Sequence, residues 1–248
     1  MLVDLPKVTI IAHRGWSAKY PENTLLAFRE AIALGAEAIE FDVHPSRDGE
    51  LVVIHDADVS RTTNGKGNVS TLPFNALRAL DAGQGERIPT LREVLELGRG
   101  KVFFHLEMKA SGIEEKVLAL VDDVGVMDAT YFSSFIHPVM GTVKALRPIA
   151  KVATLESPVL ADSEAKQLRL ATLFIKHAQK VNAMAVHVND SNTTPIIVDK
   201  LHASGLRVNV WTVDSENLAA ELVKMGVDGF FTNRIDVMLN LVRKILKK

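Results

Sequence analysis

Short apolar runs rich in β-branched residues alternate with amphipathic stretches along the chain. The runs predict strands at residues 8–13, 38–43, 102–108, 130–134, 151–155, 183–188, 207–212 and 229–232. The stretches between them have helical spacing, as where Leu25, Phe28 and Ile32 share one face and Gly35 follows. This repeated alternation predicts a TIM-type (β/α)8 barrel, which is a closed parallel sheet ringed by helices. An open doubly wound sheet is the alternative, but no GxGxxG sequence follows the first strand.

A hairpin interrupts the alternation after the second predicted strand. Asp48-Gly49 is typical of a hairpin turn, so the apolar run 51–54 should return antiparallel to that strand. Reflecting the chain about this turn places His55 close to Asp42. The hairpin therefore predicts that His55 lies at the mouth of the barrel.

The length and composition agree with one enzyme-sized domain over residues 1–248. The chain is 47% hydrophobic and 24% charged and has a formal net charge of −1, so no global basic field recruits nucleic acid. It has no cysteine, which excludes disulfides, thiolate metal sites and cysteine nucleophiles. Residues 57–88 are too long for an ordinary loop, and we expect a small helical insertion there.

No part of the sequence suggests a membrane anchor or a secretion signal. No stretch approaches the roughly 20 apolar residues that cross a bilayer. The first seven residues lack the charged head and long apolar run of a signal peptide. We therefore expect a cytoplasmic protein without stable membrane insertion, and the sequence leaves a homodimer open.

Two carboxylates share one face of the second predicted strand. Side chains alternate along a strand, so Glu40 and Asp42 lie on one face while Ile39, Phe41 and Val43 lie on the other. The outward face of a barrel strand packs on helices, which leaves the carboxylates pointing inward. Buried neighbouring carboxylates are costly unless they are neutralised, and Mg²⁺ or Ca²⁺ is the ion that such oxygens prefer. An ion pair with an inward lysine or arginine is the alternative.

The third predicted strand adds two charged residues to this interior. Glu107 and Lys109 share a face with His105. Glu107 can supply a third oxygen to the same cation, and Lys109 would direct a positive charge into the mouth of the barrel. The alternative is that Glu107 and Lys109 only neutralise each other. We expect His105, which lies deeper, to be a hydrogen-bonded core residue.

The first predicted strand ends in His13-Arg14-Gly15, where barrel enzymes place their active sites. An imidazole exchanges protons near neutral pH, and the planar guanidinium of Arg14 suits phosphate oxygens. Gly15 permits close approach of the backbone. With His55 at the same mouth, the two histidines would serve as general acid and base on opposite sides of a phosphate.

Other polar residues near the predicted mouth are open to two interpretations. Trp211 points inward and either packs against a bound ligand or is a core aromatic. His187 and Asn189 either line the pocket or hydrogen bond to each other, and we favour the second. Asn233 is expected to cap the last helix.

Several of these motifs resemble those of one enzyme family. The segments that carry the resemblance are His13-Arg14-Gly15, Pro21-Glu22-Asn23-Thr24, Glu40-Phe41-Asp42, His55-Asp56, Arg61-Thr62-Thr63, Glu107-Met108-Lys109, Ser133-Ser134-Phe135 and Trp211-Thr212-Val213. In this order they resemble the glycerophosphodiester phosphodiesterases, in particular the short cytosolic bacterial type. The sequence departs from the family at Gly229-Phe230-Phe231-Thr232-Asn233, where the family often has Asp in the last position. We attach no loss of activity to this difference.

The resemblance implies a TIM-type barrel with an insertion between barrel strands two and three. It implies hydrolysis of glycerophosphodiesters, such as glycerophosphocholine or glycerophosphoethanolamine, to sn-glycerol 3-phosphate and an alcohol. It also implies Mg²⁺ or Ca²⁺ at Glu40, Asp42 and Glu107, an acid–base pair of His13 and His55, and phosphate held by Arg14 and Lys109.

Two other functions remain as alternatives. The same site could act on lysophospholipids in a phospholipase D-type reaction, although no anchoring segment is visible. The chain could also be a non-catalytic barrel that binds a phosphate ligand, but such a protein would be expected to have lost a histidine or a carboxylate. A sugar-phosphate isomerase on this fold is less favoured, since the fold alone does not determine the function.

Overall fold

The computed structural model describes residues 8–246, so the N-terminal segment 1–7 considered above lies outside it. Its strands are β1 (Thr9–His13), β2 (Ala38–Pro45), β3 (Leu51–Val53), β4 (Phe103–Met108), β5 (Thr130–Ser134), β6 (Lys151–Leu155), β7 (Ala185–Asn189), β8 (Arg207–Trp211) and β9 (Gly229–Thr232). Its α-helices are α1 (Leu25–Ala33), α2 (Phe74–Ala79), α3 (Leu91–Gly98), α4 (Glu114–Val124), α5 (His137–Leu146), α6 (Glu164–Lys180), α7 (Pro195–Ala203), α8 (Glu216–Met225) and α9 (Ile235–Leu246).

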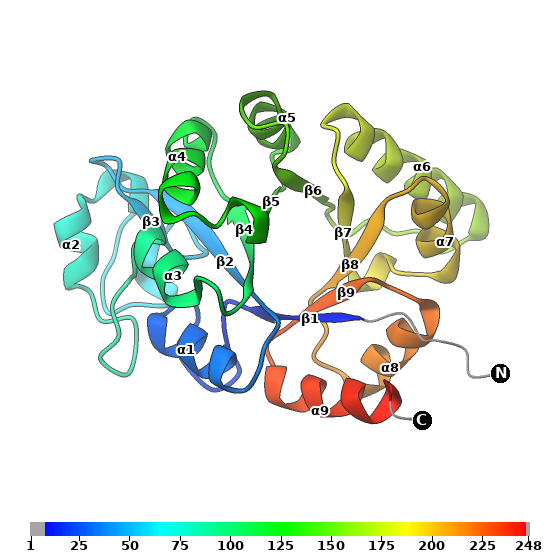
Figure 1. The fold of residues 1–248 in the computed structure, drawn as a ribbon, viewed down its shortest axis with the longest axis horizontal. Coiled ribbons are helices and arrows are strands. Elements are labelled where there is room, and N and C mark those ends of the chain that lie inside the picture. Colours follow the sequence, from blue (N-terminus) through cyan, green and yellow to red (C-terminus); the bar gives the residue numbers. More distant parts are fainter. Residues whose placement is uncertain (1–7, 247–248) are drawn as a thin grey trace.

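All strands except β3 form a closed parallel barrel. Neighbouring strands pair in the order β1-β9-β8-β7-β6-β5-β4-β2, and β1 also pairs with β2, which closes the ring. Helices surround the strands, as Figure 1 shows. The predicted (β/α)8 barrel is therefore confirmed, and the open doubly wound sheet is excluded.

Apolar residues on the outward faces of the strands bind the helices to the barrel. On β2, Ile39, Phe41 and Val43 are fully buried, and Phe41 packs edge-on against Phe28 of α1 and Phe104 of β4. Since side chains alternate along a strand, this outward packing turns the polar residues of β2 into the barrel. The core thus determines which residues reach the site.

The hairpin after β2 forms as predicted. β3 pairs antiparallel with β2, with Val53 opposite Val43, and Gly49 in the connecting turn has a φ of +85°. A backbone hydrogen bond from Ile54 to the Asp42 carbonyl (3.0 Å) extends this register. His55 follows directly and lines the pocket at the mouth of the barrel.

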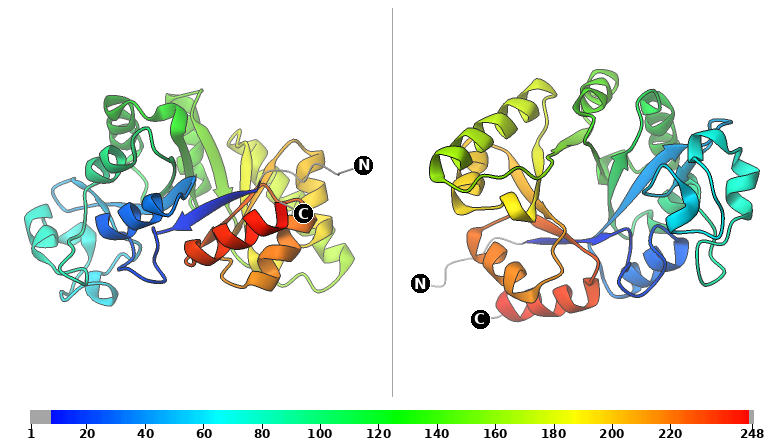
Figure 2. Two further views of the ribbon diagram at one scale, coloured as in Figure 1. Left: turned by 60° about the horizontal axis from the view of Figure 1, so that its bottom comes forward. Right: turned by 180° about the vertical axis from the view of Figure 1, so that it is seen from behind.

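The segment after the hairpin contains less helix than a helical insertion suggests. Between residues 57 and 88 it forms two 3-10 turns, Val59–Arg61 and Val69–Thr71, and the short helix α2. These elements enclose a small apolar cluster of their own, made by Val52, Ile54, Val59, Val69, Leu77 and Ile88. In Figure 2 this part of the chain, drawn in cyan, stands at one edge of the molecule.

The helices of the barrel differ in length and in apolar character. None of those within residues 8–246 combines the length and the apolar character that a bilayer crossing requires. The longest, α6, has 17 residues and is amphipathic, with Leu170 and Phe174 buried.

Candidate active site

A cavity of about 90 Å³ opens at the carboxyl ends of the barrel strands. It is lined by His13, Arg14, Glu40, His55, Glu107, Ser133, Phe135, Leu155, His187, Trp211, Thr212 and Phe231. Most of the residues expected at the mouth of the barrel therefore line one cavity. Asp42 and Lys109 are not among the lining residues, but the Lys109 ammonium contacts both Glu107 and Asp42.

Three carboxylates converge at this cavity from two adjacent strands. Glu40 and Asp42 come from β2 and Glu107 from β4, where Asp42 lies opposite Glu107 in the register. One oxygen of each lies within 4.8 Å of the others, and all three side chains are buried. The parallel register thus places the three carboxylates together.

The carboxylates shift one another's protonation. Burial, together with the neighbouring Asp42 charge, raises the pKa of Glu40 well above its usual range and the pKa of Glu107 to about 7. Burial would also raise the pKa of Asp42, but Lys109 and Arg14 outweigh it and hold this pKa well below its usual range. Without further positive charge, the cluster therefore favours retaining a proton at neutral pH.

The donor set fits a hard divalent cation. Carboxylate oxygens are the ligands that Mg²⁺ and Ca²⁺ prefer, and these three lie on two rigid strands. The raised pKa of Glu107 indicates that the cluster lacks positive charge, which such an ion would supply. The ion-pair alternative is present as well, because the Lys109 ammonium lies 2.7 Å from Glu107 Oε1 and 3.1 Å from Asp42 Oδ1.

Arg14 is held at the cavity by contacts from both its backbone and its side chain. Its backbone N–H donates to Glu40 Oε2 (2.9 Å), its Nη1 donates to Glu22 Oε1 (2.9 Å), and its Nε lies 3.5 Å from Asp42 Oδ2. Its φ of +56° is unusual for a residue other than glycine. Backbone conformations of this kind cluster at functional sites, where surrounding contacts stabilise them.

Gly15 allows the first strand to turn tightly into this arrangement. Its φ is +82°, and a Cβ at this position would lie 2.7 Å from the backbone carbon of Ala27 in α1. Only glycine meets both conditions at low cost. The predicted close approach of the backbone is therefore to α1.

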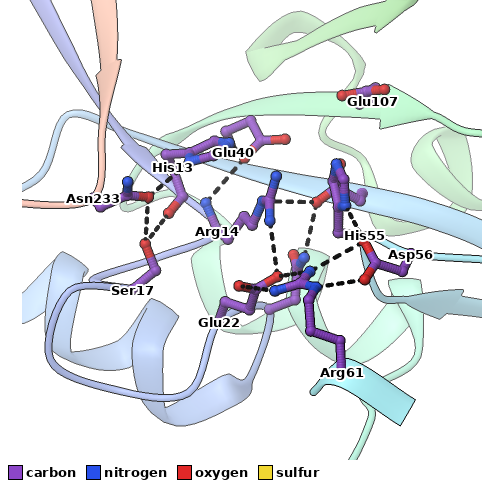
Figure 3. A network of polar contacts seen from close by, with 12 residues as sticks. His13, Arg14, Ser17, Glu22, Glu40, His55, Asp56, Arg61, Glu107 and Asn233 are labelled. Carbon is purple, nitrogen blue, oxygen red and sulfur yellow. Dashed lines mark hydrogen bonds and ion pairs between the residues drawn. The ribbon is translucent and has the colours of Figure 1, made fainter. Parts of the chain in front are cut away.

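His13 is oriented by a hydrogen-bonded chain that begins at Asp214. The Asp214 carboxylate accepts from the Asn233 amide nitrogen (2.6 Å), which turns the Asn233 amide oxygen toward His13 Nδ1 (2.8 Å). His13 must then donate from Nδ1, so its Nε2 carries the lone pair and lies 3.9 Å from Glu40 Oε2. Burial, aided by Arg14, lowers the pKa of His13 to about 4. The imidazole is therefore neutral near pH 7, and it lies beside Glu40 (Figure 3).

His55 is oriented by a carboxylate in a similar way. Its Nδ1 donates to Asp56 Oδ1 (2.6 Å), and Arg61 donates to Asp56 Oδ2 (2.5 Å). Arg61 also donates to both Glu22 oxygens (2.8 and 2.9 Å), so one guanidinium joins the loops that carry the two histidines (Figure 3). Burial lowers the pKa of His55. Both rings therefore direct a free Nε2 away from their acceptors.

Trp211 forms an apolar wall of the cavity. Its indole N–H donates to the His187 carbonyl (3.2 Å), and its ring meets Phe135 edge-on at 5.5 Å. The ring lies at the surface of the cavity rather than within the core. This position favours a ligand-contacting side chain over a core aromatic.

Two predictions for buried histidines were wrong. His187 and Asn189 do not hydrogen bond to each other: Asn189 bonds to Trp211 and Ser191, while both His187 ring nitrogens are buried without a partner. His105 is buried, as expected of a core residue, but its Nδ1 lacks the expected hydrogen-bond partner, and its ring stacks on Tyr131.

The predicted cap role of Asn233 is replaced by the contacts of its side chain with His13 and Asp214. Asp56 and Asn23 also contact the site: Asp56 accepts from His55, and Asn23 donates to Asp42 Oδ2 (2.8 Å). His-Asp in sequence is a local signal that could have indicated the Asp56 contact. No local signal links Asp214 or Asn233 to His13, because 220 residues separate Asn233 from that ring.

Comparison with known proteins identifies the family. Residues 13–237 match the glycerophosphoryl diester phosphodiesterase family. The chain belongs to this family. It is 38% identical to a glycerophosphodiester phosphodiesterase of Caldanaerobacter subterraneus, over 96% of this chain and 99% of the relative. It is 35% identical to one of Bacillus altitudinis, over 90% and 94%.

Solved structures share the fold over nearly the whole chain. A phosphodiesterase of Oleispira antarctica, solved in complex with the product sn-glycerol-3-phosphate, is 31% identical, with a TM-score of 0.80 and coverage of 95% of this chain and 96% of that one. A glycerophosphodiester phosphodiesterase of Agrobacterium tumefaciens is 28% identical, with a TM-score of 0.81 and coverage of 94% and 100%.

Proposed function

We propose that this family member hydrolyses glycerophosphodiesters, such as glycerophosphocholine and glycerophosphoethanolamine, to sn-glycerol 3-phosphate and an alcohol. The observation that carries the proposal is the meeting of three carboxylates, two oriented imidazoles and two cationic side chains at one cavity. The product bound in the Oleispira relative supports the same substrate class. A site that only bound phosphate would need the cations but neither imidazole.

Glu40, Asp42 and Glu107 would hold one Mg²⁺ or Ca²⁺ ion. When bound, such an ion stabilises negative charge that develops on phosphoryl oxygens. Arg14 and Lys109 then contact the remaining phosphate oxygens, because both present donors beside the cluster. Trp211 packs against the carbon skeleton of the glycerol or of the alcohol.

His13 and His55 act as the general acid and base, from two sides of the phosphate. One Nε2 removes a proton from the nucleophile as its oxygen bonds to phosphorus, and the other supplies a proton to the departing alcohol oxygen. The nucleophile is either water or the 2-hydroxyl of the glycerol. In the second route a cyclic phosphate forms first, and water then opens it with the proton roles reversed. The assignment of base and acid to the two rings stays open.

The experiment measures the release of sn-glycerol 3-phosphate and of the alcohol, choline or ethanolamine, by the purified chain. Glycerophosphocholine, glycerophosphoethanolamine and a micellar lysophospholipid are supplied in parallel, with Mg²⁺, with Ca²⁺ and after EDTA treatment. We expect turnover of the two soluble diesters with a metal ion and its loss with EDTA. Release of the alcohol only from the micellar substrate, with lysophosphatidic acid as the other product, would replace the proposal with lysophospholipid hydrolysis. No release of either product from any substrate would contradict it.

The metal dependence has its own control. Glu107→Gln removes one ligand charge at nearly constant shape, and Glu221→Gln removes an exposed carboxylate on α8, outside the three-carboxylate cluster. We expect the first to abolish metal-stimulated turnover and the second to leave it within about twofold, as surface changes away from such sites do. Full activity of the wild-type chain in EDTA would exclude the metal.

A further inference from the structure

A second group of metal-binding side chains lies beside the candidate active site. It consists of His137 at the start of α5, Glu156 directly after β6, and His177 in the last turn of α6. These three side chains are here called the His–Glu–His cluster. Each offers one ligand atom within 4.8 Å of the others, although three separate elements carry them. None of them belongs to the three-carboxylate cluster.

The distances within the cluster are close to those between ligands of one ion. His177 Nδ1 lies 3.0 Å from Glu156 Oε2, and His137 Nε2 lies 3.6 Å from Glu156 Oε1. A tetrahedral Zn²⁺ with bonds of about 2.0–2.2 Å holds its ligand atoms about 3.3–3.6 Å apart. The two imidazole rings, with centroids 4.7 Å apart and planes tilted by 57°, face the same carboxylate. A small shift of the side chains would allow coordination.

The burial of the Glu156 carboxylate is a second, independent observation that points to a bound cation. Its side chain is only 4% exposed, and within residues 8–246 no lysine or arginine forms an ion pair with it. A buried carboxylate requires compensating positive charge. The two imidazoles are the described groups that face it, and a bound cation would supply the compensating charge directly.

The donor set selects the class of ion. Two imidazole nitrogens and one carboxylate oxygen suit Zn²⁺ and similar transition-metal ions, whereas Mg²⁺ and Ca²⁺ prefer oxygens alone. His137 Nε2 now donates to the Leu155 carbonyl (2.9 Å), so binding would require this ring to move its proton to Nδ1. His177 Nδ1, which lies at hydrogen-bond distance from Glu156 Oε2 (3.0 Å), would likewise give up its proton to Nε2 of the same ring.

We propose that His137, Glu156 and His177 form a transition-metal site, selective for Zn²⁺ over Mg²⁺, that ties α5 and α6 to the end of β6. The site adjoins the cavity through Phe135, two residues before His137, and Leu155, next to Glu156. An ion there would link the loops that carry these two cavity residues. The proposal does not depend on the catalytic function.

The test measures Zn²⁺ binding by calorimetry in a chain whose carboxylate cluster is disabled by Glu40→Gln and Glu107→Gln. We expect one equivalent of Zn²⁺ to bind in the presence of excess Mg²⁺. Adding His177→Gln or His137→Gln should weaken this binding by more than about tenfold, since losing even an outer partner of a metal ligand costs 10- to 100-fold. His202→Gln is the matched control, because His202 pairs with a single carboxylate, Asp228, at 2.9 Å.

Nitrogen-15 NMR of the histidine rings reports metal coordination directly. A purely structural role of His137 and His177 would leave these ring signals unchanged on Zn²⁺ addition. On Zn²⁺ addition, the ring signals of His137 and His177 should shift to those of metal-bound tautomers, while that of His202 should not. The wild-type chain saturated with Mg²⁺ serves as a second sample if the double variant does not fold. Absence of bound Zn²⁺ in both samples, or equal binding with and without His177, would overturn the proposal.

Discussion

Asn233 accepts a hydrogen bond from His13 across 220 residues of sequence, with its amide oxygen 2.8 Å from the imidazole Nδ1. Asp214 holds the amide in that orientation from its other side. The relationship makes Asn233 a positioning residue, because it selects which ring nitrogen of His13 is free to move a proton. Its contribution can be separated from that of the imidazole itself.

We expect Asn233→Ala to lower kcat by about 10- to 100-fold with little change in KM, because a wrongly oriented or wrongly protonated histidine slows proton transfer. Asn233→Asp would place a carboxylate against Asp214 and should also lower activity. The double variant Asp214→Asn, Asn233→Asp exchanges the two groups and should recover most of it. Equal kcat in the wild type and Asn233→Ala, measured by product release, would remove the positioning role.

Replacing either imidazole tests the proposed proton transfers directly. His13→Ala and His55→Ala should each lower kcat by about 10²- to 10⁴-fold, since each removes a general acid or base. Unfolding midpoints should stay close to that of the wild type, which circular dichroism checks. A variant that keeps near-normal turnover would show that its histidine takes no part in the reaction.

Replacing Lys109 should strengthen metal binding and weaken turnover of the substrate. Its ammonium lies beside two of the three carboxylates, so it competes with a cation for their charge. We expect Lys109→Met to strengthen Mg²⁺ binding several-fold while it weakens kcat/KM at saturating metal by about tenfold or more. Calorimetry and steady-state kinetics measure the two effects, and weaker Mg²⁺ binding in the variant would contradict this interpretation.

His187 should make the fold sensitive to mild acid. Burial lowers its pKa to about 3, against about 6.5 in the unfolded chain, so between these values only the unfolded state binds the proton. Stability contributed by the neutral ring is therefore complete above pH 6.5 and is lost as the pH falls toward 3. Between pH 7 and 5 this amounts to about 2 kcal/mol for one such group.

The variant His187→Gln, which does not titrate, should lose correspondingly less stability over that interval. Urea unfolding at pH 7, 6 and 5, with EDTA present, gives the free energy of unfolding for both chains. Parallel pH dependence of the two chains would show that His187 is protonated in the folded state or does not control the acid response.

Substituting Gly15 and Gly112 separates the stability cost of a steric contact from the cost of the backbone conformation. Their φ values are +82° and +83°, but a Cβ at Gly15 would meet the Ala27 backbone at 2.7 Å, whereas nothing lies within 4 Å at Gly112. Gly112→Ala should cost about 1 kcal/mol for the left-handed conformation. Gly15→Ala should cost a further 1–3 kcal/mol or so from overpacking. Equal losses in chemical denaturation would show that α1 moves aside freely.

The order of strands and helices follows from local information. Alternation of side chains placed Glu40 and Asp42 on one face of β2 before any contact was known, and the Asp48-Gly49 turn returned His55 toward the same end. Parallel pairing of β2 with β4 then required Glu107 to join them. Such features depend on the two-residue period of side chains along a strand and on turn geometry, and residues that are neighbours in sequence determine both.

Contacts between distant segments were decided by the tertiary structure. The sequence alone determined the barrel, its hairpin and which charged residues face inward. The stagger of the closed barrel and the packing of its helices decided that Asn233 meets His13, that Lys109 lies between two carboxylates and that Glu156 lies between two imidazoles. These contacts join residues far apart in the chain, and their distances depend on how whole elements pack, which no local pattern encodes.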